Sequence, residues 1–299
     1  MPSPGRRGSL LVLAAAMLWG TTGTAQALGP SSSNPLAVGA IRMVVGGVAL
    51  VLLATAKGAV AHWPEWRRGS VMVAGVAMAA YQPLFFAGVL RAGVAVGTMI
   101  AIGSAPVLAA LLARWIRREP LSRRWAIATV VAVAGLVLLA SSGESAGIEA
   151  SGVILALGAG ACYAVYAVAA KGIVGRHPTV PAMALVFGWA AALSIPVLLL
   201  ADRSWLRELS GVAMTLYLGL VTTTLAYLLF AGGLRVTQVG TAATLTLGEP
   251  GTAAALAVLV LGESLSPAAG IGLVLIASAL LVLARHQASV PRYPAPGAS

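Results

Sequence analysis

The chain has 299 residues, of which 59% are hydrophobic and only 9% are charged, and its formal net charge is +11. A soluble domain carries roughly 25% charged residues, so this composition excludes an ordinary soluble protein. The basic residues are spread over short segments between apolar stretches, which favours contact with anionic lipid headgroups and argues against nucleic acid binding.

Long apolar stretches follow one another along the whole chain. The hydrocarbon core of a bilayer is about 30 Å thick and needs about 20 apolar residues per helical crossing. Strands of a membrane barrel are shorter and alternate in polarity, so these stretches predict helices. The sequence therefore predicts an all-α integral membrane protein with ten transmembrane helices, at residues 8–28, 35–55, 69–90, 93–115, 124–141, 151–174, 180–201, 209–231, 237–261 and 267–285.

Loop charges indicate the orientation. With a cytoplasmic N-terminus, almost all Arg and Lys residues outside the apolar stretches fall on the cytoplasmic side, and three fall outside, at Arg91, Arg203 and Arg207. This asymmetry follows the positive-inside rule and predicts that both termini are cytoplasmic.

The first two predicted helices each carry unusual residues in their apolar interior. Trp19 and Thr22 lie three residues apart, on one face of the first helix. Arg42 lies about 12 Å into the second helix, where a charge costs about 2.5 to 3.5 kcal/mol. Snorkelling to the interface, pairing with Glu249 and binding a substrate carboxylate all remain open for Arg42.

Further polar aromatic residues lie at a similar depth in later helices. A buried tyrosine hydroxyl needs a partner, so several of these side chains are expected to face the protein interior. The group predicts a substrate pocket with aromatic walls, although an aromatic packing core remains an alternative. Together with Trp19, Thr22 and Arg42, the candidate substrate-binding residues are Tyr81, Gln82, Tyr163, Tyr166, Trp189 and Glu249.

An internal repeat appears at an offset of 144 residues. Ala-Gly-Val-Leu-Arg at 87–91 aligns with Ala-Gly-Gly-Leu-Arg at 231–235, and Glu119 aligns with Glu263. Each copy holds five helices, and an odd number makes the second copy cross the membrane in the opposite sense. The expected domains are a first repeat at 1–145, a second inverted repeat at 146–286 and a disordered cytoplasmic tail at 287–299.

Matched helix breakers occur in the fourth and ninth helices. A proline removes an amide donor and displaces the carbonyl four residues before it. Such breaks in corresponding positions of two repeats are typical of transporter binding regions, while a packing kink is the alternative. We expect the breaks at Gly103 and Pro106 in the first copy and at Gly248, Pro250 and Gly251 in the second.

Two glutamates have different settings. Glu249 lies near the middle of the ninth helix, where burial favours the neutral acid, so proton transfer and a structural hydrogen bond both remain open. Glu119 stands beside Arg117 and Arg118, which predicts an exposed ion pair that contributes little to stability.

The sequence resembles the EamA-type branch of the drug/metabolite transporter superfamily. The resemblance rests on the duplicated ten-helix layout, LWGTTGT at 18–24, the Leu-Arg pairs ending at 91 and 235, Pro106 with Pro250, and LGESLS at 261–266. Within that branch it looks most like the YddG-type amino acid exporters. The resemblance implies a central cavity walled by helices one to four and six to nine, with helices five and ten at the periphery.

The resemblance and the aromatic pocket together predict a secondary transporter of the bacterial inner membrane that exports amino acids by alternating access, with broad specificity. An exporter of purines, nucleosides, sugars or cationic drugs is the alternative. Without an ATPase motif, facilitated diffusion or proton exchange is the expected energy source. We expect no enzymatic activity, cofactor, metal or nucleic acid partner, and we favour a monomer.

Overall fold

The computed structural model describes residues 4–58, 68–141, 149–262, 264 and 266–286. Every regular element in these ranges is helical, and ten helical segments are long and apolar enough to cross a membrane. The all-helical membrane fold predicted from the sequence is thereby confirmed. The expected domain junction at 145/146 and the tail at 287–299 lie outside the described residues.

The first half of the chain forms five spans, of which the first is split into two helices. A break at Thr21 separates these two helices, whereas the sequence predicts one continuous helix at 8–28. The helices are α1 (Pro4–Gly20), α2 (Thr22–Ala27), α3 (Pro35–Ala56), α4 (Arg68–Ala92), α5 (Val94–Arg117) and α6 (Arg123–Ala140).

The second half forms another five spans, two of which are composite. The eighth span contains a π-helical segment, η3 (Leu220–Leu225), between two α-helices. The remaining elements are α7 (Ala150–Val174), α8 (Thr179–Leu200), η2 (Ser204–Arg207), α9 (Leu209–Gly219), α10 (Ala226–Leu234), α11 (Val239–Leu245), α12 (Gly248–Leu261) and α13 (Pro267–His286).

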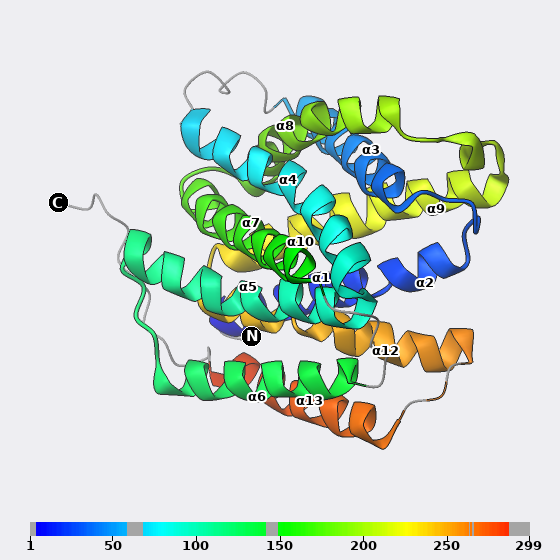
Figure 1. Ribbon diagram of the computed structural model, residues 1–299. Coiled ribbons are helices and arrows are strands. Elements are labelled where there is room, and N and C mark those ends of the chain that lie inside the picture. The colour runs from blue at the N-terminus through cyan, green and yellow to red at the C-terminus, as the bar shows by residue number, and fades with distance from the viewer. Residues whose placement is uncertain (1–3, 59–67, 142–148, 263, 265, 287–299) are drawn as a thin grey trace.

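The duplication is visible in the packing of equivalent helices. An offset of 144 residues carries α3 onto α8, and these two helices pack against each other. α6 and α13 form a second such pair along one side of the molecule (Figure 1). Their backbones meet at Gly135 and Gly272, where a Cβ on Gly135 would lie 2.6 Å from the Gly272 carbonyl oxygen. Each half has five spans, so the two repeats are inverted.

A capping side chain and a glycine determine where two of the helices begin. The Asn34 side chain accepts hydrogen bonds from the amides of Leu36 and Ala37, with Pro35 in the first turn of α3. At the junction of α4 and α5, Gly93 has a φ of 84°, which allows the chain to reverse direction within one residue.

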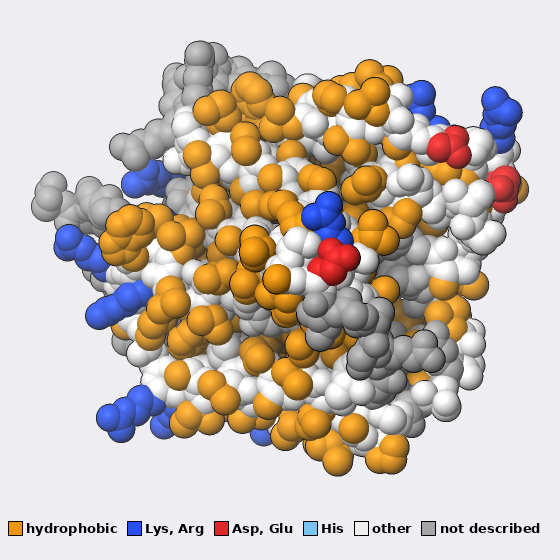
Figure 2. All heavy atoms as spheres, in the orientation of Figure 1, with side chains coloured by type: hydrophobic (Ala, Val, Ile, Leu, Met, Phe, Trp, Pro, Cys, Tyr) orange, Lys and Arg blue, Asp and Glu red, His pale blue; other side chains and the backbone are white. Residues whose placement is uncertain are grey.

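The outer surface is largely apolar, and basic side chains gather at one end. Figure 2 shows hydrophobic side chains over most of this face and Lys and Arg projecting at its left edge, where α5 ends and α6 begins. We call this end the basic end; it carries Arg114, Arg117, Arg118, Lys171, Arg176 and Arg235, whereas Arg91 and Arg203 lie at the opposite end.

The two predicted helix breaks differ from each other. In the second repeat, Thr246 and Leu247 separate α11 from α12, and Gly248, Pro250 and Gly251 lie in the first turn of α12. A proline in the first turn is tolerated because its missing amide needs no helical partner. In the first repeat, α5 is continuous through Gly103 and Pro106, so the interruption expected there is absent.

Candidate functional site

An aromatic cluster fills the centre of the molecule between α1, α7, α8 and α10. The ring centroid of Trp19 lies 4.8 Å from that of Tyr227 and 5.5 Å from that of Phe230. Phe187 lies 4.5 Å from Tyr227, and Tyr163 lies 6.1 Å from Phe230. The structure therefore brings the predicted pair Trp19 and Tyr163 to one place. Phe187 and Phe230 escaped sequence analysis because a phenylalanine in an apolar helix has no distinguishing polar signal.

The indole of Trp19 is anchored to the π-helical segment. Its Nε1 donates a hydrogen bond of 2.9 Å to the carbonyl oxygen of Thr222. In the same segment, the Thr224 hydroxyl donates to the carbonyl oxygen of Gly46 on α3 at 3.2 Å. π-helical segments often occur at functional sites. These contacts join the first, second and eighth spans in the membrane interior.

Opposite charges from the two repeats face the same region. Arg42 on α3 and Glu249 on α12 interact electrostatically with each other and with Tyr81 and Tyr227. No ion pair within 4.0 Å joins Arg42 to Glu249, although both residues lie in the described part of the chain. The buried Nε of Arg42 has no hydrogen-bond partner among the residues that the structure describes. An unpaired buried donor of this kind is available to a ligand.

Tyr163 presents a second unpartnered group near Glu249. The residue is 8% exposed, and its hydroxyl lies close to Thr246 and interacts electrostatically with Glu249. The hydroxyl meets no geometric criterion for a hydrogen bond within the described residues. The Thr246 hydroxyl instead donates to the carbonyl oxygen of Ala243 at 2.7 Å.

Three other predicted residues border this region. Tyr81 is half-buried and stacks on Phe85 with a centroid distance of 5.8 Å. Gln82 is buried against α3, where a Cβ on Gly39 would lie 3.2 Å from its Oε1. Thr22 is half-buried in the first turn of α2.

Of the two remaining predicted residues, Tyr166 packs inside the aromatic cluster, against Phe187 and Tyr227, and Trp189 lies on an exposed helix face. Tyr166 has no exposed surface, and its hydroxyl donates to the Met183 sulfur at 3.7 Å. Trp189 is 45% exposed and lies on the face of α8 that also exposes Leu193. Helical periodicity in the sequence shows which residues share a helix face. It does not show whether that face points to a pocket, is fully packed as at Tyr166, or points outward as at Trp189.

Comparison with models of protein families shows which family the chain belongs to. A model of the EamA-like transporter family matches residues 6–141 and, a second time, residues 150–285. The chain belongs to the EamA-like transporter family. The protein is therefore a transporter and not an enzyme, and the double match agrees with the duplication seen in the fold.

Curated relatives of this EamA-like transporter include two named bacterial proteins. The uncharacterized transporter YwfM of Bacillus subtilis is 45% identical over 275 residues, which cover 92% of this chain and 93% of the relative. The threonine/homoserine exporter RhtA of Escherichia coli K12 is 29% identical over 261 residues, which cover 86% and 84%. A solved crystal structure superposes with a TM-score of 0.81 at 23% identity, covering 93% of this chain and 98% of the other, and shares the fold.

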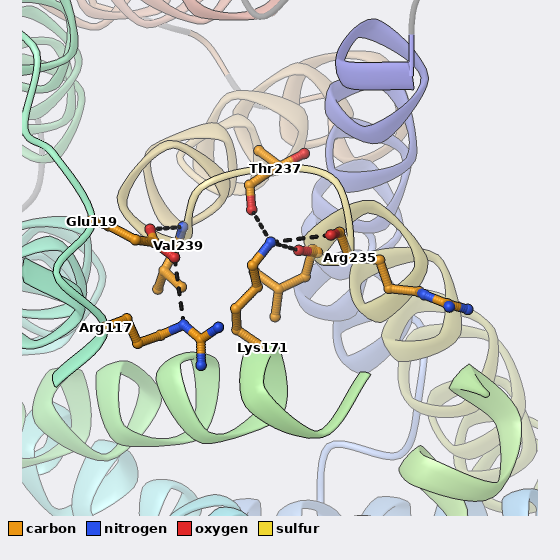
Figure 3. Close-up of polar contacts among 7 residues, drawn as sticks. Arg117, Glu119, Lys171, Arg235, Thr237 and Val239 are labelled. Carbon is orange, nitrogen blue, oxygen red and sulfur yellow. Dashed lines mark hydrogen bonds and ion pairs between the residues drawn. The ribbon is translucent and has the colours of Figure 1, made fainter. Parts of the chain in front are cut away.

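At the basic end of the EamA-like transporter, a lysine on one helix forms hydrogen bonds to the turn between two others. Lys171 near the end of α7 donates three hydrogen bonds to backbone carbonyl oxygens in the turn between α10 and α11 (Figure 3). The distances are 2.6 Å to Leu234, 3.1 Å to Arg235 and 2.8 Å to Thr237. The lysine thereby satisfies carbonyls at the C-terminal end of α10 that lack helical partners.

A glutamate from the first repeat holds the other side of this turn. The Glu119 Oε2 accepts a hydrogen bond of 2.8 Å from the Val239 amide, at the N-terminus of α11. Its Oε1 lies 3.5 Å from the Arg117 Nε, and the two side chains are 15% and 31% exposed, respectively. The predicted ion pair exists, but Glu119 is largely covered and also caps a helix. We call Glu119, Lys171 and the turn at 234–239 the polar latch.

The two ends of the transporter differ in packing. Every residue of α11 is buried, and α11 lies beside the polar latch. In α12, which continues the same span toward the opposite end, no residue is buried. The repeat equivalent of Lys171 is Ala27, which cannot form such hydrogen bonds, and the equivalent of Glu119, Glu263, lies outside the described residues. The ninth span is therefore fully buried along α11, whereas the residues of α12 are partly or fully exposed.

Proposed function

We propose that this EamA-like transporter exports neutral amino acids across the bacterial inner membrane by alternating access, with both termini in the cytoplasm. The relative RhtA, named as a threonine/homoserine exporter, supports the substrate class. The concentration of basic residues at one end supports the orientation, since basic loops stay cytoplasmic. The finer resemblance to YddG-type exporters stays a prediction.

The unpaired charges Arg42 and Glu249 carry the assignment. A neutral amino acid has a carboxylate and an ammonium group on one carbon atom. In the proposed binding mode, the guanidinium of Arg42 donates to the substrate carboxylate, and a carboxyl oxygen of Glu249 accepts a hydrogen bond from the ammonium group. Because each charge comes from a different repeat, bound substrate connects the two halves, and release at either side follows when one half rotates.

The aromatic cluster suits a broad range of side chains. Trp19 and Tyr163 in the cluster, and Tyr81 at its border, provide aromatic surface with few fixed hydrogen-bonding groups, so we expect weak discrimination between side chains of similar size. The Tyr163 hydroxyl provides one free polar group for a hydroxyl such as that of threonine or homoserine. Specificity is therefore expected to lie in the α-amino and α-carboxyl groups.

The polar latch supports closure at the cytoplasmic side in this conformation. Lys171 and Glu119 tie the turn before α11 to α7 and to the α5–α6 connection, while no residue of α12 is buried. Breaking these contacts would free α11 to move and open a path from the cytoplasmic side to the aromatic cluster.

The test is exchange in proteoliposomes that contain the purified transporter and are loaded with unlabelled amino acids. We expect wild-type protein to exchange labelled threonine, methionine and phenylalanine. Arg42→Gln and Glu249→Gln should each lower exchange about tenfold or more, because a hydrogen bond to a charged group contributes about 1.5 to 3 kcal/mol. The matched controls Arg91→Gln and Glu149→Gln change the same residue types at the end of the molecule opposite the basic end, and we expect them to leave exchange unchanged.

The outcomes separate the candidate substrates. Equal loss in the control variants would contradict the assignment of Arg42 and Glu249 to the site. Absence of amino acid exchange, combined with transport of nucleosides, purines, sugars or cationic drugs by the same vesicles, would overturn the substrate class and leave the family assignment intact.

A further inference from the structure

A groove lies on the outer side of the molecule between α4 and α5, with α7 as its floor. The two helices are joined at Gly93, and a Cβ on Gly97 near this junction would lie only 2.7 Å from the Val89 Cα, so the glycine allows α5 to pack closely against α4. From there α4 and α5 diverge toward the basic end, and α7 lies between them (Figure 1). The resulting groove has a volume of about 970 Å³.

The lining of this groove is apolar along its length and basic at its mouth. Its basic end carries the positively charged Arg117 and Arg176 together with His177, and no acidic residue lines it among the described residues. The apolar lining comes from all three helices: Val71, Val73, Leu112, Ile116, Val165, Val168, Ala169 and Ile173. Such a distribution matches an amphiphile with one anionic end.

The guanidinium of Arg117 is placed to receive an anion. It lies over α7 at Gly172, where a Cβ would be only 3.2 Å from its Nη1 (Figure 3). Its ion pair with Glu119 uses the Nε edge. A guanidinium has five N–H donors in a planar fork, so the Nη donors on the other side stay available to phosphate oxygens.

We propose that this groove binds one anionic phospholipid of the cytoplasmic leaflet, with its phosphate on Arg117 and Arg176 and an acyl chain along the apolar lining. Basic pockets between transmembrane helices on the cytoplasmic side recognise anionic headgroups. A water-soluble phosphate compound would leave the apolar length of the groove unused. A zwitterionic lipid would bring an ammonium group toward two arginines. The proposal is independent of the transported substrate.

Native mass spectrometry of the purified transporter tests the proposal directly. The protein is mixed with phosphatidylglycerol and phosphatidylcholine of identical acyl chains, and retention of each lipid is measured. Wild-type protein should retain phosphatidylglycerol preferentially. The Arg117→Gln/Arg176→Gln variant should lose about fivefold in this preference per arginine, which corresponds to about 1 kcal/mol per basic residue at a membrane surface.

A charge-matched control separates the groove from general surface charge. Arg114→Gln/Arg285→Gln removes the same net charge from two exposed arginines that do not line the groove. Unchanged retention in the groove variant, or equal losses in both variants, would overturn the proposal. If the double variant fails to fold, phosphatidylglycerol retention is compared between the single variants Arg176→Gln and Arg285→Gln, which both change exposed side chains.

Two further arms test the nature of the ligand. Ala169→Trp places a bulky side chain in the apolar lining and should reduce phosphatidylglycerol retention although both arginines remain. Retention that is unaffected by Ala169→Trp would contradict an acyl chain in the groove. Displacement of the bound lipid by millimolar glycerol phosphate would also overturn the proposal, because it would identify a site for free phosphate. Each readout is lipid binding, so a failure of amino acid export would leave it unaffected.

Discussion

At Gly20 the absence of a side chain determines how closely the first span approaches Glu249. A Cβ there would lie 2.6 Å from the Glu249 carbonyl oxygen and equally close to the Thr252 Cβ. Real Cβ contacts are longer, so any side chain at this position must push α12 away from α1. The position of the proposed ammonium-binding carboxylate therefore depends on a glycine in another helix.

Gly20→Ala is accordingly expected to destabilise the transporter by about 1 to 3 kcal/mol through overpacking and to reduce amino acid exchange. Gly23 lies three residues further and has no atom near its Cβ position, so Gly23→Ala should be neutral or slightly stabilising. Thermal unfolding in detergent and vesicle exchange compare the two variants. Similar melting temperatures and exchange rates would show that α1 and α12 do not pack as described.

The hydrogen bond between Trp19 and Thr222 gives a second prediction at the same scale. Trp19→Phe keeps an aromatic ring but leaves the Thr222 carbonyl oxygen buried without this donor, at a cost of about 1 to 3 kcal/mol. The melting temperature should fall by several degrees. Trp115→Phe alters an exposed indole on α5 and should leave it unchanged. A melting temperature equal to wild type in Trp19→Phe would count against the anchoring role.

At the scale of elements, the polar latch connects helices of both repeats at one end. Lys171 from α7 and Glu119 from the α5–α6 connection converge on a single turn, where they satisfy carbonyls at the end of α10 and an amide at the start of α11. The helix dipole makes a cation favourable at the C-terminal end of α10 and an anion favourable at the N-terminal end of α11. The first repeat has alanine in place of the lysine at the opposite end.

Replacing the lysine should therefore open the basic end. Lys171→Met keeps the length of the side chain but removes three hydrogen bonds. The reporter is Ala243→Cys on the buried α11, in a Cys162→Ala background. With Lys171→Met it should react with a thiol reagent roughly tenfold faster than with Lys171 present, because one hydrogen bond to a charged group contributes at least about 1.5 kcal/mol. Arg235→Gln, at an exposed side chain of the same turn, is the control. No difference between the two variants would rule out a gating role for Lys171.

At the scale of the whole molecule, ten spans place both chain ends on one side, and the loop charges predict which side that is. In the Cys162→Ala background, a membrane-impermeant thiol reagent should label a Ser32→Cys variant in intact cells. A Leu121→Cys variant, in the α5–α6 connection, should react only after permeabilisation. The reverse pattern would contradict the predicted orientation.

Much of the architecture was predictable from local sequence. Apolar length identified the spans, and matched Arg, Pro and Glu residues identified the duplication, because these features depend only on position along the chain. The interruption near Pro250 was also predicted, whereas the equivalent one at Pro106 was not found. Proline lowers the stability of a helix locally, but packing on both sides can maintain the helix through it, as α5 shows.

The site was only partly predictable. Sequence by itself determined that Trp19, Arg42, Tyr163 and Glu249 lie at membrane depth, since polar groups stand out within apolar helices. Tertiary structure alone decided that Arg42 and Glu249 interact electrostatically without forming an ion pair, that Tyr166 is fully packed and that Trp189 is 45% exposed. Lys171 looked like an ordinary cytoplasmic basic residue until the fold placed it on three carbonyls. The reason is physical: burial and spacing are encoded along one chain, whereas hydrogen-bond partners come from segments that only folding brings together.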